Sequence, residues 1–410
     1  MTEPGDGRRI AGGPRLVMLL GALTALGPFS LQIVAPALPA VSADLAVPPA
    51  AAQLLLSLSL LAMAVSTLVW GPLSDRLGRR PVMLGGIWLG ILGTGLAALA
   101  PGLELAILGR VLQAGGLIAG MVLARAVAQD LYGREGAAGV IGQITAVMVI
   151  APMVAPALSG VLVEQIGWRA IFWAVLGLAL LTALVAHRHL PETAPPHAAV
   201  PLGATLADMG KAFADLGRRA GFWAYAGFGV ASLAAFLFFV GAAPFVMHAA
   251  YGLGPQAYGL WFVVMAAAYM AANMACGPIS RRLGGVATLR LGAALSFAGI
   301  VVGIVLALAG VMHPAALFLP AIGQSIGGGL AVPNAMAGAQ AAVAGRAGAA
   351  SGLMGSAQFA VSGLATQVAG ALPHDTALPL FLGMGAILGS GIAIHLLLSR
   401  AAPGGPARQG

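Results

Sequence analysis

Twelve long runs of apolar residues follow one another along this chain of 410 residues. A hydrocarbon layer about 30 Å thick requires roughly 20 apolar residues in a helix, and each run reaches or approaches that length. Only 8% of the residues are charged, against roughly 25% in soluble domains, so few polar residues are available to cover a water-facing surface. We therefore expect an all-α integral membrane protein with twelve spans. They are 16–38, 51–71, 82–100, 103–124, 137–163, 168–187, 221–247, 256–279, 287–309, 315–340, 347–372 and 376–399.

The distribution of Lys and Arg predicts the orientation of these spans. With the N-terminus placed inside, seventeen of the 20 basic residues fall in inside segments, Arg169 alone falls outside, and Arg110 and Arg125 lie within spans. Because cytoplasmic loops carry an excess of basic residues, both termini are expected in the cytoplasm. The net charge of +8 is spread over many loops rather than gathered in one patch, which argues against a nucleic-acid partner.

The sequence offers no cofactor, metal or enzyme site. Cys276 is the only cysteine, and the seven histidines lack the spacing of metal ligands. No set of nucleophile and base is recognisable, and no G-x-x-x-x-G-K-[ST] loop for ATP is present. We expect a protein that is not an enzyme, in which an ion gradient or substrate exchange supplies the driving force.

The longest polar stretch divides the chain into two halves of six spans each. Residues 188–220 begin with several prolines and continue with apolar residues at three- and four-residue spacing. This pattern predicts a connector with a short amphipathic helix on the cytoplasmic membrane surface. The halves, 1–187 and 221–410, share a loop sequence, because Gly71–Arg80 after span two resembles 277–285 after span eight. Since parallel repeats are a recurring transporter design, we expect two pseudo-symmetric six-helix bundles.

The first of these loops resembles the signature loop of the major facilitator superfamily, G-x-L-x-D-R-x-G-R-R. A simple basic cytoplasmic loop would also contain several arginines, but it would not require the ordered glycines and the aspartate. The resemblance implies the major facilitator fold. It also implies that Asp75 latches the two halves in the outward-facing state, against the positive start of span eleven near 347–351. The residues of this expected latch are Gly71, Asp75, Arg76, Gly78, Arg79 and Arg80.

Arg110 lies about seven residues from the outer end of span four, in the segment 108–116 that also contains Gln113. At 1.5 Å per residue the guanidinium lies ~10 Å deep. A charge at this depth is costly and marks a transport pathway or an ion pair by default, the alternative being a side chain that snorkels to the surface. Arg110 resembles the span-four arginine of proton-coupled drug exporters. That resemblance implies a substrate or proton cavity that contains Arg110 and Gln113.

Span five contains two prolines four residues apart, Pro152 and Pro156, followed by Gly160. Prolines inside a helix remove backbone hydrogen bonds and introduce bends, and small residues beside them permit close contact between helices. One proline is commonly tolerated in a membrane helix without any functional role. Two prolines four residues apart are less well explained as tolerated prolines. The pattern resembles the antiporter motif of drug exporters, although Ser159 stands where a glycine is usual.

Further segments resemble the bicyclomycin/chloramphenicol-resistance (Bcr/CflA) branch of the superfamily. They include 124–132, which contains Arg125 and Asp130, and 348–355 in span eleven. The resemblance implies a monomeric exporter in the lipid bilayer of the bacterial cytoplasmic (inner) membrane. It would move drugs or other small, largely apolar compounds in antiport with protons, and so contribute to antibiotic resistance.

Gln32 departs from this branch, which usually has an aspartate at that position of span one. Gln32 is ~9 Å deep, level with Arg110, so we expect the two side chains to form a hydrogen bond across the cavity. Glutamine cannot titrate, so the charge of Arg110 would stay uncompensated and transport should favour neutral or anionic substrates over cationic ones. Proton coupling is then either lost or carried by another group, and Glu104 on span four is the first candidate.

Polar and aromatic residues of the second half are the remaining candidates for the cavity. They are Phe236, Phe239, Asn273, Gln324, Asn334 and Gln358. The favoured function is a secondary exporter that works by alternating access. A metabolite exporter or exchanger without proton coupling, and a membrane sensor or scaffold that transports nothing, remain as alternatives. The missing acid at Gln32 favours the alternatives, whereas the retained motif residues Asp75, Pro152 and Pro156 argue against a protein that transports nothing.

Overall fold

The computed structural model describes residues 13–194, 202–343 and 347–401. Within these ranges the regular structure is helical, as the composition predicts. The predicted cytoplasmic termini lie outside the described residues, as do the connector positions 195–201. The helices are α1 (Pro14–Gln32), η1 (Ala35–Ala37), α2 (Leu38–Asp44), α3 (Pro49–Ala52), α4 (Leu54–Leu77), α5 (Arg79–Ala98), α6 (Leu103–Gln165), α7 (Arg169–His189), α8 (Leu202–Gly217), α9 (Ala220–Ala249), α10 (Pro255–Leu283), α11 (Gly285–Leu308), α12 (Pro314–Ala341), α13 (Ala347–Ala371) and α14 (Leu378–Ala401).

Eleven helical segments of the described chain are long and apolar enough to cross a membrane. Two of them, Leu103–Gly133 and Gly139–Gln165, belong to the single helix α6, which continues past the predicted end of span four. The remaining predicted span, the eleventh at 347–372, corresponds to α13, a helix of 25 residues that contains no charged side chain. Its glycines, serines and two glutamines lower its mean hydropathy. A membrane helix can carry such residues where it packs against other helices, and α13 packs against α4 and α9.

Gly133 is the point at which α6 changes direction. Its backbone, with φ 66° and ψ 176°, is not helical although helix continues on both sides. Glycine adopts positive φ without the steric penalty of a side chain. The spans predicted at 103–124 and 137–163 are therefore joined by one local break within a single helix.

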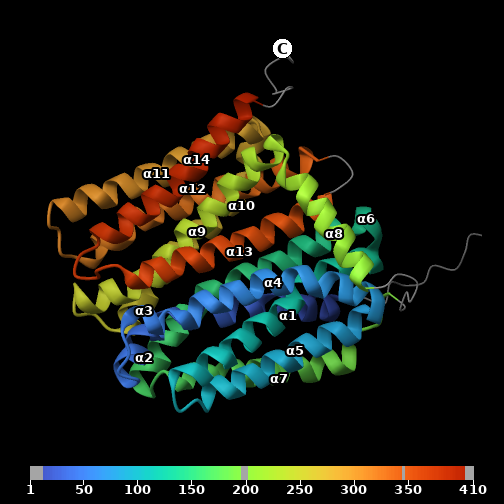
Figure 1. The fold of residues 1–410 in the computed structure, drawn as a ribbon, viewed down its shortest axis with the longest axis horizontal. Helices are drawn as coiled ribbons and strands as arrows, with labels where there is room; N and C mark the ends of the chain where they lie inside the picture. The colour runs from blue at the N-terminus through green and yellow to red at the C-terminus, as the bar shows by residue number, and fades with distance from the viewer. Residues whose placement is uncertain (1–12, 195–201, 344–346, 402–410) are drawn as a thin grey trace, which may run out of the picture.

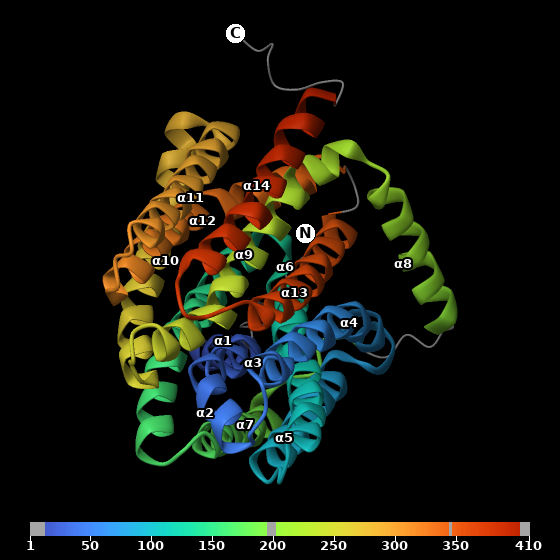
Figure 2. The ribbon, with the colours of Figure 1, turned by 60° about the vertical axis from the view of Figure 1, so that its left-hand side comes forward.

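The helices form two groups that lie side by side (Figure 1). The first group, α1 to α7, is coloured blue to green, and the second, α9 to α14, is coloured yellow to red; we call them the N half and the C half. Helix α8 crosses from one half to the other at one end of the molecule (Figures 1 and 2). We call this the connector end, and the end that carries α2 and α3 the opposite end.

Glycines bring equivalent helix pairs of the two halves into backbone contact. A Cβ atom added to Gly109 of α6 would lie 2.5 Å from the backbone nitrogen of Ala97 in α5. A Cβ atom added to Gly292 of α11 would lie 2.5 Å from the carbonyl oxygen of Gly327 in α12. Small residues allow this close packing where no hydrophobic force drives helices together in lipid. The third and fourth spans of each half thus pack in the same way.

Helix α8 is the amphipathic helix predicted in the connector. Leu216 is buried, and Phe213 packs with Phe222 and Met354 of the C half. On the exposed side Lys211 pairs with an aspartate one turn away, at 3.4 Å. Part of the apolar face of α8 therefore contacts the C half, and its position on a membrane surface stays a prediction.

Candidate substrate cavity

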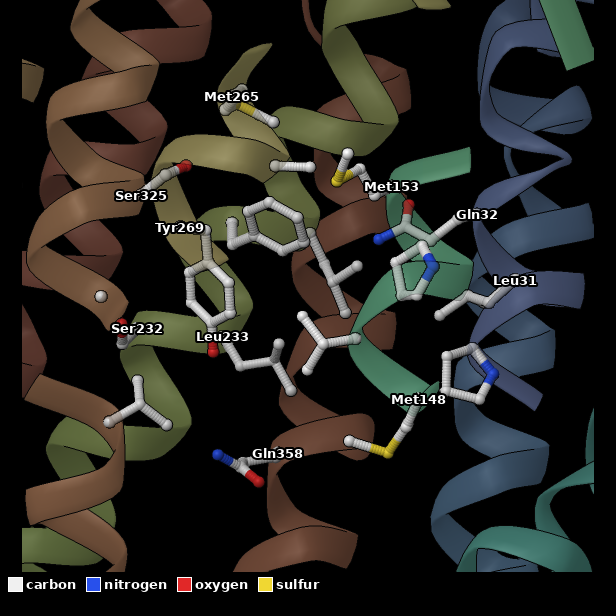
Figure 3. Close-up of a pocket in the computed structure, with 18 of the residues that line it drawn as sticks. Leu31, Gln32, Met148, Met153, Ser232, Leu233, Met265, Tyr269, Ser325 and Gln358 are labelled. Atoms are coloured by element: carbon white, nitrogen blue, oxygen red, sulfur yellow. The ribbon is translucent and has the colours of Figure 1, made fainter. Parts of the chain in front are cut away.

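A cavity of about 270 Å³ lies between the two halves, near the middle of the helices. Figure 3 shows Leu31, Gln32, Met148 and Met153 of the N half on one side of it. On the other side lie residues of α9, α10, α12 and α13. The full lining comprises Pro28, Leu31, Gln32, Met63, Ile118, Met121, Met148, Val149, Pro152, Met153, Ser232, Leu233, Phe236, Leu237, Phe262, Met265, Ala266, Tyr269, Gln324, Ser325, Gly328, Val332, Gln358 and Phe359.

The lining is apolar and contains no formal charge. Among these described residues there is no Asp, Glu, Lys, Arg or His, and the polar members are three glutamines, two serines and one tyrosine. Five methionines and four aromatic residues are among the 24 lining residues. Methionine is unbranched and polarisable, so such a surface can adjust to ligands of different shape.

Several predicted residues do line the cavity. Gln32, Pro152 and Phe236 are in the wall, and so are Gln324 and Gln358 of the C half. Nε2 of Gln358 donates a hydrogen bond to the carbonyl oxygen of Gly229 at 3.1 Å. Gln32 is only 5% exposed, and its Oε1 has no hydrogen-bond partner.

The predicted hydrogen bond between Gln32 and Arg110 is not formed, and the placement of Arg110 in the cavity wall was wrong. Arg110 is 1% exposed and lies inside the N half. Its Nη1 donates to the carbonyl oxygen of Ser30 at 2.9 Å and to Oε1 of Gln113, and its Nε donates to the carbonyl oxygen of Leu55 at 3.2 Å. These acceptors belong to α1, α6 and α4, so the guanidinium joins three helices behind the cavity wall.

Gln113 was also expected in the cavity and instead supports Arg110. It is fully buried, and its Nε2 donates to Oγ1 of Thr94 in α5 at 2.9 Å. A charged group inside the membrane needs such partners, because an unpaired ion would be expensive there. The backbone carbonyls and the Gln113 amide provide them for Nε and Nη1 without an acid, whereas Nη2 is buried without a partner.

Four further candidates lie away from the cavity. Glu104 is an exposed residue in the first turn of α6, which removes it as a proton carrier in the cavity. Phe239 packs edge to face on Phe318, with 5.6 Å between ring centroids. Asn334 donates to the sulfur of Cys276 at 3.2 Å and thereby joins α12 to α10. Asn273 is half-buried on α10 and is not part of the lining.

The two halves are held together at the opposite end. Oγ of Ser57 in α4 donates to Oε1 of Gln367 in α13 at 2.6 Å, and Nε2 of Gln367 donates to the carbonyl oxygen of Ala50 at 2.9 Å. Nearer the middle, Ser356 donates to the carbonyl oxygen of Ala64 at 2.9 Å. Among the described residues these three side-chain hydrogen bonds join the halves, two between α4 and α13 and one between α3 and α13.

The predicted antiporter motif forms a second contact between the halves at the same end. A Cβ atom added to Gly160 of α6 would lie 2.6 Å from Cα of Gln256 in α10. A Cβ atom added to Gly259 of α10 would lie 2.6 Å from the carbonyl oxygen of Pro156. Pro152, one turn earlier, lines the cavity. The motif therefore connects the cavity wall with the closed end.

A family model described as the Major Facilitator Superfamily matches residues 20–366. The chain belongs to the Major Facilitator Superfamily. This assignment confirms the predicted fold and identifies a multi-pass membrane transporter rather than an enzyme. The solved peptide transporter POT in complex with sulfate has a TM-score of 0.74 at 16% identity, covering 98% of both chains. A bacterial homolog of the human lysosomal transporter Spinster has a TM-score of 0.69 at 16% identity, covering 97% of this chain and 96% of that one.

Relatives of this superfamily member confirm the resemblance to the drug-resistance branch. The chain is 28% identical over 394 residues to the bicyclomycin resistance protein homolog of Haemophilus influenzae, covering 94% of this chain and 96% of that protein. It is 36% identical over 179 residues to the chloramphenicol resistance protein of Pseudomonas aeruginosa, covering 43% and 42%. The chain spans about half the length, 51%, of the uncharacterized MFS-type transporter YdgK of Bacillus subtilis, at 31% identity.

The signature loop of this superfamily member forms a network within the N half. Nη1 of Arg79 contacts the Asp75 carboxylate, and its Nε donates to Asp130 at 3.1 Å. The backbone nitrogens of Arg79 and Arg80 donate to the Glu192 carboxylate at 2.8 and 3.2 Å. The Asp75 side chain is 61% exposed, and within the described residues it forms an ion pair with Arg79 rather than with α13. The outward-facing latch thus stays a prediction in this arrangement.

The remaining motif residues occupy less specific positions. Gly71 lies within α4 with open space around it, so the chain reversal depends on Gly78, which has φ 97°. Arg80 donates through Nη2 to the carbonyl oxygen of His187 at 2.7 Å. Arg76 and Arg125 are half-buried on α4 and α6.

Sequence reasoning missed the methionine wall and the polar residues Ser232, Tyr269 and Ser325. A usable signal was present, since Met148, Pro152 and Pro156 recur at four-residue spacing on one face of a helix. Methionines at helical spacing are equally consistent with ordinary packing, so the pattern alone does not identify a cavity.

Proposed function

We propose that this superfamily member exports small, largely apolar compounds by alternating access, in antiport with protons, from the cytoplasm of a bacterium across its inner membrane. The supporting observation is a central apolar cavity whose two walls belong to different halves. Rocking of one half against the other around a fixed midplane site is a general transport mechanism. The names of the relatives support drugs as substrates, since they refer to bicyclomycin, chloramphenicol and multidrug resistance.

The orientation of this proposal rests on the basic loops. The connector end carries Arg79, Arg80 and the exposed Arg218, and the positive-inside rule assigns such an end to the cytoplasm. The contacts across Ser57 and Gln367 then close the outer side. The described conformation would be the one that receives substrate from the inside.

The orientation can be tested with single cysteines in a Cys276→Ser background. Arg218→Cys should be protected from a membrane-impermeant thiol reagent in intact cells, whereas Pro48→Cys near α3 should react; both positions are exposed. Labelling in the reverse pattern would overturn the orientation.

The latch remains part of the proposal and concerns the outward-facing state. Asp75 would leave Arg79 and face the N-terminal end of α13 when the connector end closes. An acid at a helix N-terminus contributes about 0.3–2 kcal/mol, enough to shift a conformational equilibrium several-fold. Asp75→Asn should therefore slow transport without reducing the amount of protein in the membrane. A wild-type transport rate in this variant would exclude the latch.

The deciding experiment uses purified protein in liposomes with a panel that includes chloramphenicol and bicyclomycin. Exporter activity predicts that a pH gradient drives accumulation of at least one compound, and that adding this compound changes the internal pH. Protein-free liposomes provide the background. No accumulation of any panel member would contradict the proposed function.

One observation favours a second candidate, exchange without proton coupling. The described cavity wall holds no acid and no histidine, and Glu104 lies outside it. A substrate could then be driven only by its own gradient or by a counter-substrate. This candidate predicts counterflow of substrate without any change of internal pH, which the same liposomes measure.

A further inference from the structure

The cavity contains one polar side chain of the N half, Gln32, and it is not engaged by the protein. Only 5% of Gln32 is exposed; within the described residues its Oε1 accepts no hydrogen bond and its Nε2 donates none. Figure 3 shows the Gln32 side chain pointing from α1 into the cavity, with its amide nitrogen nearer to the cavity than its amide oxygen. Buried polar groups normally have a partner. A partner for this amide is therefore to be expected among the molecules that enter the cavity.

The charge of the cavity limits what such a molecule can be. No described lining residue is acidic, so a cation entering the cavity would lose its hydration without gaining a counter-ion. Contacts with the faces of Phe236, Phe262, Phe359 or Tyr269 would recover only part of that loss. Arg110 does not pair directly with an anion in the cavity either, because it is buried behind the wall, where Nε and Nη1 donate to Ser30, Leu55 and Gln113 and Nη2 has no partner.

We propose that the cavity selects an uncharged molecule with an apolar body and a hydrogen-bond acceptor, and that Gln32 Nε2 donates to that acceptor. Gln32 is then the specificity-determining residue of the N half. The inference rests on the proposed function, since it assumes that the cavity is the substrate site, and it adds the charge and the polar group of the substrate. It narrows the expectation that neutral or anionic substrates are favoured over cationic ones to neutral substrates alone.

Gln32 is the polar residue that the N half contributes to this wall, and the other polar lining residues belong to the C half. Gln358 already donates through Nε2 to the carbonyl oxygen of Gly229 at 3.1 Å. Ser232, Tyr269 and Ser325 belong to the C half, on the other side of the cavity (Figure 3). A molecule bound to Gln32 can still contact them, but the N half offers its donor from Gln32.

Three probes with the same triphenyl body separate charge from hydrogen bonding. Triphenylphosphine oxide is neutral with a strong acceptor, triphenylmethane is neutral without one, and methyltriphenylphosphonium replaces the oxygen by a methyl group and carries a positive charge. Binding to the full-length protein in detergent is measured by competition with a radiolabelled oxide. Wild type should bind the oxide at least tenfold more tightly than the phosphonium.

Two variants of Gln32 and one control complete the test. Gln32→Met keeps the length of the side chain and removes its donor, so affinity for the oxide should fall roughly two- to tenfold, the range of one hydrogen bond, while triphenylmethane is unaffected. Gln32→Glu should reverse the preference, binding the phosphonium more tightly as pH rises. Gln165→Met, which makes the same substitution at an exposed glutamine of α6 outside the cavity wall, should leave the oxide affinity within about twofold.

Equal affinity of wild type for the oxide and the phosphonium would overturn the inference, as would an unchanged oxide affinity in Gln32→Met or failure of the oxide to bind. The liposome panel distinguishes this failure from failure of the proposed function. Accumulation of panel compounds regardless of charge and of residue 32 would leave the exporter intact and remove only the selectivity. No accumulation of any compound would remove the exporter itself.

Discussion

Gly78 and Gly284 end equivalent helices of the two halves with the same backbone conformation. Gly78 follows α4 with φ 97° and ψ 153°, and Gly284 follows α10 with φ 85° and ψ 151°. Each backbone nitrogen donates to the carbonyl oxygen four residues earlier, Ser74 in one case and Ser280 in the other. The repeated loop sequence therefore encodes one repeated turn, which glycine makes without steric cost.

The two glycines differ in their surroundings, and this difference gives a matched pair of variants. A Cβ atom at position 78 would lie 2.5 Å from Oε2 of Glu192, whereas nothing lies within 4 Å of one at position 284. In both variants alanine must adopt a positive-φ, extended backbone conformation that is essentially restricted to glycine, which costs roughly 1–3 kcal/mol. Gly78→Ala must also displace a carboxylate that accepts from Arg79 and Arg80. Thermal unfolding in detergent should show a larger loss for Gly78→Ala; equal losses would contradict this account.

Arg110 is expected to be a structural tie within the N half. Lysine carries the same charge but not the planar guanidinium, so Arg110→Lys cannot reach Ser30, Leu55 and Gln113 together. Each lost hydrogen bond to a charged group contributes roughly 1.5–3 kcal/mol. The variant should unfold at a clearly lower temperature than wild type, and Gln113→Leu should show a smaller decrease. A thermal stability unchanged by Arg110→Lys would show that these hydrogen bonds contribute little.

The fold was predictable from the sequence to a greater extent than the site. Runs of apolar residues and basic loops depend on composition, and they indicated the spans and the paired loops. Depth along a helix was also predictable, and it placed Gln32 and Arg110 at one level. Direction around the helix was not. Ser30 and Gln32 are two residues apart and thus about 200° apart around α1, so the Ser30 carbonyl faces Arg110 while Gln32 faces the cavity.

Packing also determines which polar residues line the cavity and which bond to a neighbouring helix, and the sequence alone does not distinguish the two cases. Asn334 and Gln324 both lie on α12, yet Asn334 bonds with Ser280 and Cys276 of α10 whereas Gln324 lines the cavity. Such a choice depends on which neighbouring helix is adjacent at that height, and this follows from three-dimensional packing rather than from local sequence.

His374 should make stability depend on pH. It lies between α13 and α14, and its Nε2 bonds to the carbonyl oxygen of Ala369 at 3.2 Å while its ring packs on Phe245. Burial lowers the pKa of His374 below its ordinary value of 6.5, more than the nearby Asp375 raises it. The folded protein therefore binds this proton less well than the unfolded chain does, and stability is lost as pH falls below about 6.5.

The measurement is the unfolding temperature in detergent between pH 8 and pH 5. Wild type should lose stability over the acidic part of this range, at up to about 1.4 kcal/mol per pH unit for one group. His374→Asn cannot titrate and should show a smaller decrease over the same range. Parallel curves for the two proteins would mean that His374 does not control this dependence.

Gly160 should control closure of the opposite end, because α6 and α10 touch there through their backbones. A Cβ atom at position 160 would lie 2.6 Å from both Cα of Gln256 and the carbonyl oxygen of Pro255. Backbone atoms cannot turn aside as a flexible side chain can, so Gly160→Ala must separate the two helices. The contact joins the halves, and its loss should favour conformations that are open at this end.

A control on the same helix separates this effect from helix propensity. Gly142→Ala places its methyl group where nothing lies within 4 Å, and alanine favours helix over glycine by about 1 kcal/mol. Gly142→Ala should retain transport and gain slight stability. Gly160→Ala should lose most transport, and Pro48→Cys and Gln256→Cys in its background should react faster with a thiol reagent added from the outside. Wild-type transport together with unchanged labelling in Gly160→Ala would show that α6 and α10 need not touch for the end to close.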